Sequence, residues 1–79
     1  MTADELMREL TLAMLYLTSW EERAGDFVQR RAWKGYRFED LNALSDEGLV
    51  QGSRSAKSVW LTQDGQRRAT AFLHSSFGL

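Results

Sequence analysis

The pattern that most constrains this fold is a short amphipathic segment that stops at a glycine in the second half of the chain. Phe38, Leu41 and Leu44 recur at a spacing of three residues, which is typical of one face of a helix. Gly48 follows at a point where the left-handed conformation often ends a helix, and Leu49 can form the accompanying hydrophobic contact. The sequence therefore predicts a helix that stops abruptly at this glycine.

Two strand candidates come directly after the glycine. Residues 49–51 and 58–62 contain strand-forming side chains, and the stretch between them is polar, as the tip of a hairpin should be. Because side chains alternate between the two faces of a strand, Val59 and Leu61 would face the core and Trp60 would lie on the other side. The sequence thus predicts a two-stranded β-hairpin after the helix.

Two further helices flank this unit. Thr2 and Glu5 fit a capping box, and apolar residues then recur at helical spacing from Leu6 to Leu17. Thr62 can cap a last helix near the end of the chain. One face of that helix would consist of Ala69, Phe72, Leu73 and Phe77.

The segment between the first two helices is the least regular part of the sequence. Residues 27–29 fit either a short strand or a stub of helix, because periodicity cannot decide over so few residues. Trp33 and Tyr36 are expected to pack on the first and third helices, as aromatic side chains in a small domain usually do. The secondary structure of this segment therefore stays open.

Three stretches of the chain resemble a small uncharacterised bacterial family of unknown function. They are residues 31–41, 48–50 and 57–65, of which the first, with its Ala-Trp-Lys-Gly-Tyr run, is the most specific. That family is placed in the winged helix-turn-helix superfamily, which implies an α+β fold of three main helices and a two-stranded wing in a single domain over residues 1–79. A helix-turn-helix also needs a second helix before the recognition helix. Residues 21–36 contain no clean one, so that helix is expected to be degenerate.

The composition excludes several classes of site. The 79 residues include no cysteine and one histidine, which excludes a disulfide framework, a thiolate metal site and a histidine cluster. The sequence contains no nucleophile motif, metal-ligand spacing or glycine-rich phosphate loop. We therefore expect a protein that is not an enzyme and has no catalytic residue, cofactor or metal. The acidic first residues and the lack of a long apolar run predict a cytoplasmic protein with no membrane partner.

The charged residues occur in blocks, although the net charge is only −1. Residues 30–37 carry four basic side chains and no acidic one, whereas the predicted helix over residues 38–47 carries four carboxylates. By analogy with winged helices, this helix would be the recognition helix, residues 52–57 the wing, and double-stranded DNA the partner. The carboxylates would repel the phosphate backbone unless they point sideways or pair with basic residues. The candidate nucleic-acid-binding residues are Arg30, Arg31, Lys34, Arg37, Asn42, Arg54 and Lys57.

A protein-interaction or dimerisation module of the same fold is the alternative function. Both terminal helices are apolar, and a homodimer would supply core that so short a chain barely builds alone. The candidate interface residues are Leu12, Leu15, Tyr16, Phe72 and Phe77. Aromatic residues beside basic ones can also stack on exposed bases, and Trp60 on the outer face of the hairpin is the better candidate for such a contact.

Overall fold

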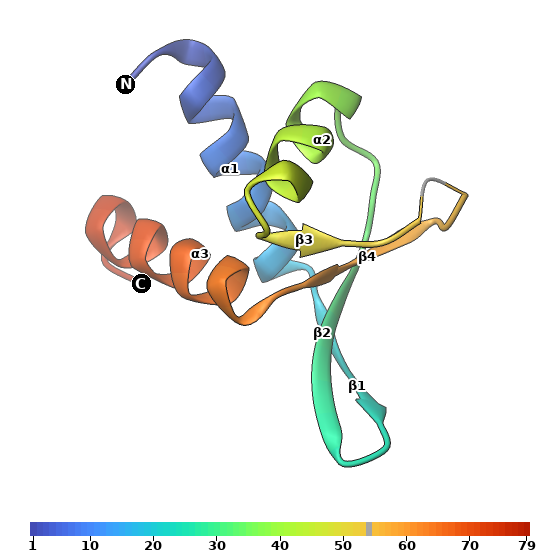
Figure 1. Ribbon diagram of the computed structural model, residues 1–79. Coiled ribbons are helices and arrows are strands. Elements are labelled where there is room, and N and C mark those ends of the chain that lie inside the picture. Colours follow the sequence, from blue (N-terminus) through green and yellow to red (C-terminus); the bar gives the residue numbers. More distant parts are fainter. Residues whose placement is uncertain (54) are drawn as a thin grey trace.

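The computed structural model describes residues 1–53 and 55–79. Within these residues, three helices alternate with two β-hairpins along the chain (Figure 1). The fold is therefore α+β, as the sequence predicts. The elements are α1 (Ala3–Leu17), β1 (Trp20–Ala24), β2 (Phe27–Trp33), α2 (Phe38–Asp46), β3 (Val50–Gln51), β4 (Ser58–Leu61) and α3 (Gln63–Phe77).

The strands form one antiparallel sheet in the order β1-β2-β4-β3. Strand β2 pairs with β1 over residues 27–31, and it pairs with β4 only over residues 30–33. The two hairpins are thus joined edge to edge through β2 and β4. Because the second pairing is short, the turn end of the β1–β2 hairpin projects beyond the rest of the sheet (Figure 1).

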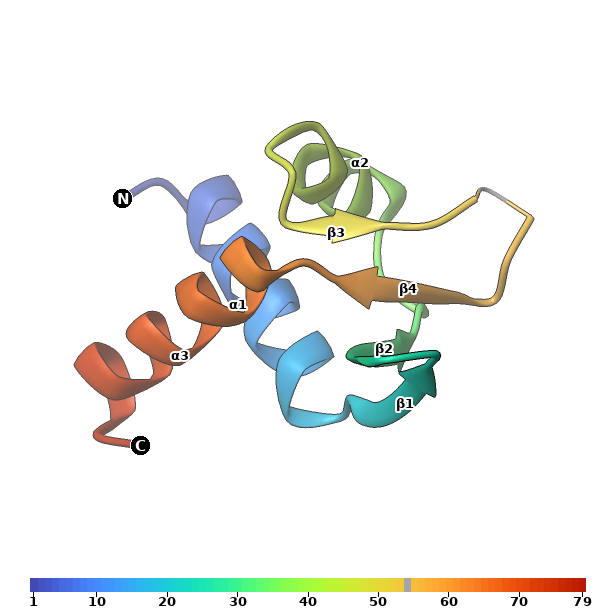
Figure 2. The same cartoon turned by 60° about the horizontal axis from the view of Figure 1, so that its bottom comes forward.

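The core lies between the helices and one face of the sheet. Leu12 and Leu15 of α1 are 0% exposed and belong to one cluster with Ala32, Val59 and Leu61 of the sheet. The helices gather on this side, and the hairpins extend away from them (Figure 2). In the described part of the chain, no helix packs on the opposite face of the sheet, so that face is left to solvent.

The abrupt end of α2 is confirmed. Gly48 has a φ of 74°, in the left-handed region that glycine adopts without a Cβ penalty. The amide of Gly48 donates to the Ser45 carbonyl at 3.0 Å, and the amide of Leu49 donates to the Leu44 carbonyl at 2.9 Å. These two bonds satisfy carbonyls that the end of the helix would leave without partners. The predicted hairpin follows, with Val59 and Leu61 buried and Trp60 on the other face.

One junction ties the end of α2 to the start of α3. The Thr62 hydroxyl donates to the Gly48 carbonyl at 2.7 Å and accepts from the Gly65 amide at 2.9 Å, which confirms Thr62 as the helix cap. The Thr62 amide donates to the Leu49 carbonyl at 3.1 Å. Gly65 is buried against that same carbonyl. The start of α3 therefore lies directly on the backbone where β3 begins.

The structure differs from the sequence-based prediction in two respects, the number of strands and the degenerate second helix. Residues 20–33 form a β-hairpin, so the sheet has four strands rather than the two of a wing alone. The turn at Gly25, with a φ of 65°, connects the new pair. The pattern was hard to recognise because Arg30 lies at a core-facing register position. Its guanidinium lies 5.2 Å from the centre of the Tyr16 ring, so its stem takes the place of an apolar side chain.

The expectation for the aromatic residues before α2 is wrong for Trp33. Tyr36 is partly buried against the core cluster. Trp33 instead is 64% exposed and contacts Trp20, with ring centres 5.1 Å apart. Its strand position explains the difference, because Trp33 pairs with Ser58 on the sheet face that the helices do not cover.

The predicted interface residues do not all lie on the surface. Leu12 and Leu15 are fully buried within the monomer, so they cannot contact a partner while the fold is intact. Tyr16 packs against the same core and is only partly exposed. Phe72 and Phe77 contact each other edge to face at 6.0 Å, and Phe77 remains 60% exposed. Among the described residues, no helix combines the length and the apolar composition that crossing a bilayer requires.

The junction gives a stability prediction. A Cβ added at Gly65 would overlap the backbone carbonyl of Leu49, so Gly65→Ala forces two backbone segments apart. We expect a loss of about 1–3 kcal/mol in the free energy of unfolding, measured by urea denaturation. Gly35→Ala is the matched control, because an added Cβ there meets no atom within 4 Å. Equal stabilities of the two variants would contradict the close packing of α3 on β3.

Candidate functional site

The six predicted nucleic-acid-binding residues that the structure describes do not form one surface. Arg30 and Arg31 are adjacent on β2, so their side chains leave opposite faces of the sheet. Arg30 lies on the helix side, where its guanidinium donates to the Ser19 hydroxyl at 2.9 Å and lies 3.6 Å from a Glu21 carboxylate oxygen. Its side chain is only 28% exposed. Arg30 is therefore used to hold the end of α1 against the first hairpin.

Arg31 is held in place on the outer face of the sheet. Its guanidinium lies over the Trp60 ring at 4.2 Å from the ring centre. Its Nε donates to the Ser58 hydroxyl at 2.6 Å, and one of its terminal nitrogens lies 3.8 Å from a Glu22 carboxylate oxygen. These contacts hold the guanidinium at the sheet surface, where the side chain is only 27% exposed.

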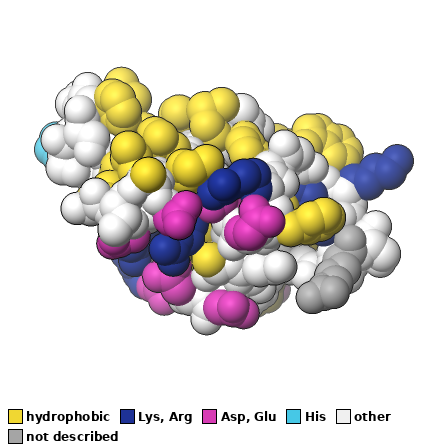
Figure 3. Space-filling model, turned by 90° about the horizontal axis from the view of Figure 1, so that it is seen from above, with side chains coloured by type: hydrophobic (Ala, Val, Ile, Leu, Met, Phe, Trp, Pro, Cys, Tyr) yellow, Lys and Arg dark blue, Asp and Glu magenta, His cyan; other side chains and the backbone are white. Residues whose placement is uncertain are grey.

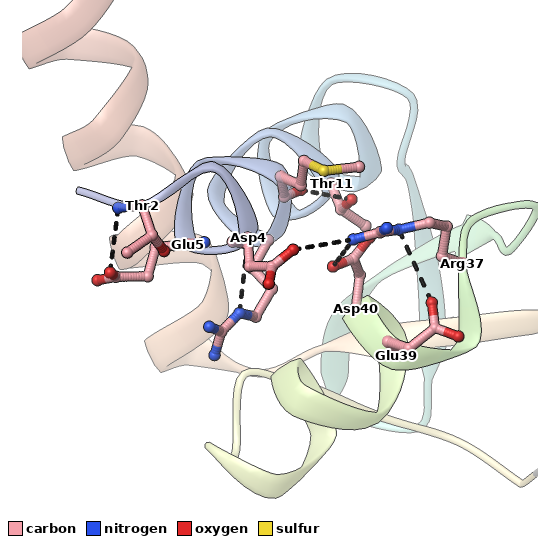
Figure 4. Close-up of polar contacts among 9 residues, drawn as sticks. Thr2, Asp4, Glu5, Thr11, Arg37, Glu39 and Asp40 are labelled. Carbon is pink, nitrogen blue, oxygen red and sulfur yellow. Dashed lines mark hydrogen bonds and ion pairs between the residues drawn. The ribbon is translucent and has the colours of Figure 1, made fainter.

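Arg37 joins the start of α2 to α1 (Figure 4). Its Nε and one terminal nitrogen donate to the two carboxylate oxygens of Asp40 at 2.9 and 3.3 Å. Carboxylate oxygens of Glu39 and Asp4 lie 3.8 and 3.9 Å from the same guanidinium. The hydrogen bond that Arg37 donates to Asp40 raises the pKa of Arg37. Asp40 is only 4% exposed, so one of the four helix carboxylates points inward and not toward a ligand.

A groove lies between α2 and the β3–β4 hairpin, and two of the remaining predicted residues line it. This groove has a volume of about 680 Å³, and both Lys34 and Asn42 line it. Asp46 lines it as well, so its wall carries both signs of charge. The Lys34 ammonium donates to the Ser53 carbonyl at 3.0 Å. Lys57 is exposed in the loop of the hairpin, directly before β4, and Arg54 lies outside the described residues.

Seen from above, basic and acidic side chains lie side by side over the middle of the molecule (Figure 3). The ion pairs account for this mixture, since Arg37 contacts three carboxylates and Arg68 contacts Glu9 and Glu47. Three of the four residues in the basic block, Arg30, Arg31 and Arg37, are therefore paired with acidic residues. The block does not form a continuous positive surface on the described residues.

The outer face of the sheet is the more distinctive surface. The strand pairings place Trp20, Arg31, Trp60 and Gln51 in one row across all four strands. Trp33 lies on the same face, two residues beyond Arg31. All three tryptophans of the chain therefore share the face that the helices leave open. Trp and Arg are the residues most enriched where proteins contact one another.

The hydrogen-bond donors of this face are only partly used. The Trp20 indole donates to a Glu22 carboxylate oxygen at 3.3 Å. The indoles of Trp33 and Trp60 make no hydrogen bond among the described residues, and neither is buried. Two N–H donors therefore remain available beside exposed ring surface. Trp20 was missed by sequence reasoning, because residues 20–24 show no alternation of apolar and polar side chains; the turn at Gly25 was the one local signal of a hairpin.

The buried carboxylate gives a second stability prediction. Arg37→Met leaves Asp40 buried without its cationic partner, which is costly, whereas Asp40→Asn leaves Arg37 half-exposed to water. We expect thermal unfolding to show a larger loss for Arg37→Met than for Asp40→Asn. Arg67→Met is the control, because Arg67 and Asp64 form an exposed pair and its loss should stay within about 0.5 kcal/mol. Equal effects of Arg37→Met and Arg67→Met would contradict this role of the pair.

Comparison with known proteins gives a family and no activity. The searches of curated proteins and of solved structures each found no match. A family model described as a domain of unknown function matches residues 3–79, which is nearly the whole chain. That match agrees with the resemblance to an uncharacterised family. The chain therefore belongs to the family of the domain of unknown function DUF6429.

Proposed function

We propose that this chain is a non-catalytic protein-binding module and that the outer face of its sheet is the contact surface. The observation that carries the proposal is the gathering of Trp20, Trp33 and Trp60 around Arg31 on the one sheet face without helices. Aromatic rings bury a large apolar area at little cost in side-chain entropy. A solvent-facing cluster of them is best explained by a partner that covers it.

Double-stranded DNA fits the arrangement less well. The order of α2, the β3–β4 hairpin and α3 is that of the second half of a winged helix, and this supports keeping the winged-helix likeness as part of the proposal. However, β1 and β2 take the place in the chain where a helix-turn-helix has its second helix. Arg30, Arg31 and Arg37 are also paired within the molecule. We therefore prefer the interaction module to the DNA-binding regulator.

The charge of the outer face favours an uncharged ligand. Its two ionised side chains, Arg31 and Glu22, lie 3.8 Å apart and cancel. The neighbouring positions are occupied by uncharged Gln29, Gln51 and Ser58. A nucleic acid gains most of its affinity from basic side chains on its phosphates, which this face does not offer in excess. A polypeptide segment without charge does not depend on such ion pairs for its affinity, so it suits this face better.

The free indole donors indicate the conformation of that segment. A polyproline II helix has no internal hydrogen bonds, so its carbonyls are open to donors such as the N–H groups of Trp33 and Trp60. Its rings and flat sides pack well on aromatic surfaces, and its stiffness lowers the entropy lost on binding. These 79 residues contain no proline, so such a segment would lie outside them. We thus assign a proline-rich, extended segment as the ligand class.

Tryptophan emission tests this proposal directly, because every tryptophan of the chain lies on the proposed surface. Titration with a peptide of ten prolines should give a saturable change in emission. Trp33→Ala should weaken binding at least tenfold, since Trp33 is the most exposed of the three rings. Phe38→Ala on α2 is the control, because Phe38 is 75% exposed but lies away from this face.

A single-stranded oligothymidylate in low salt is the competing ligand, since bases also stack on aromatic rings. A saturable response to the oligonucleotide with none to the proline peptide would overturn the proposal. So would equal binding of the proline peptide to Trp33→Ala and to the unmodified protein.

A further inference from the structure

Helix α1 has a second apolar face that the monomer does not cover. Leu12 and Leu15 point into the core and are fully buried. On the other side of the helix, five large apolar side chains are each between 38% and 54% exposed. They are Leu6, Met7, Leu10, Met14 and Leu17. An amphipathic helix normally buries one stripe, so this second stripe needs its own explanation.

The spacing of the exposed stripe is that of a helix-pairing seam. Ala3, Met7, Leu10, Met14 and Leu17 are separated by four, three, four and three residues. This alternation keeps apolar side chains facing a second helix and defines the a and d positions of a coiled coil. A contact surface for a sheet or for an irregular loop would not require it. The pattern therefore indicates that the missing partner is a helix.

We infer that this partner is α1 of a second copy of the chain, packed antiparallel to the first. The charges of α1 support both parts of this inference. Asp4, Glu5, Arg8 and Glu9 all lie in its first half, and residues 10–17 carry no charge. An antiparallel pair places the acidic first turn of each helix beside the uncharged end of the other. A parallel pair would bring the two Asp4 side chains together and would also align the helix dipoles unfavourably.

The size of the seam sets the strength of the pairing. The five exposed large side chains of α1, which include Leu6 beside the seam, expose roughly 400 Å² per copy, within the range of patches that mark interaction sites. Two such patches bury about 800 Å², below the roughly 1,200 Å² of a stable interface. The homodimer is therefore weak: it forms at high protein concentration and dissociates on dilution. Its residues differ from the core residues Leu12 and Leu15 that the sequence suggested, because those already fill the monomer.

Mass measurement across a concentration series tests the seam. Light scattering should show a rise from one to two chain masses for the unmodified protein, and Leu10→Glu should keep a single chain mass throughout. Phe38→Glu is the control, because it places the same charge at an exposed apolar position on α2 and should leave the dimer intact. Circular dichroism checks that each variant is folded. If Leu10→Glu unfolds, Met14→Gln should still shift the transition to at least tenfold higher concentration.

Single cysteines test the orientation, and the natural absence of cysteine makes the result unambiguous. In the antiparallel pair, Leu10 lies at the centre of the seam and Leu17 faces Ala3 of the other copy. Leu10→Cys should therefore form a disulfide-linked dimer on oxidation. Leu17→Cys should not, but a mixture of Ala3→Cys and Leu17→Cys should give the mixed product.

A linked dimer of Leu17→Cys alone would overturn the antiparallel orientation. A single chain mass for the unmodified protein at every concentration up to the millimolar range would overturn the inference as a whole. Trp33→Ala should leave the dimer unchanged, because the outer face of the sheet and the α1 seam are separate surfaces. Failure of the peptide-binding proposal would therefore not affect this result.

Discussion

The contact of Thr62 and Gly65 with the backbone of residues 48 and 49 is the constraint on which much of the structure depends. Four elements meet there, because α2 ends and β3 begins on one side while β4 ends and α3 begins on the other. The hydroxyl of Thr62 serves both chain segments at once. Once this junction is closed, the register of β3 on β4 is fixed, and so is the face to which each side chain of β4 points.

The alternation of side chains along the strands then divides the molecule chemically. Val59 and Leu61 complete the core, while Trp60 and Arg31 are placed together on the other face. Most of the basic side chains make contacts within the molecule and are not directed toward a ligand. Arg30 and Arg37 each connect α1 to a following element by way of hydrogen bonds and carboxylates. A block of positive charge in a sequence can therefore be a set of internal connections.

The second half of the fold was predictable because its signals are local. Gly48 ends a helix, Thr62 begins one, and Val59 and Leu61 show the alternation of a half-buried strand. The first hairpin was not predictable, since Arg30 occupies a core-facing position and β2 depends on partners distant in sequence. The gathering of the tryptophans on one face of the sheet was not predictable for the same reason. Trp20, Trp33 and Trp60 come from three strands, and only the register of those strands brings them together.

Strand β1 has a neighbour on one side only, and its sequence suits that exposed position. An open strand edge can recruit a further strand from another molecule and so begin an aggregate. In β1, the consecutive charges of Glu21, Glu22 and Arg23 oppose such growth, because an added identical strand would bring like charges near one another. Three charged side chains that lie outside the core cluster thereby oppose the addition of a further strand at this border of the sheet.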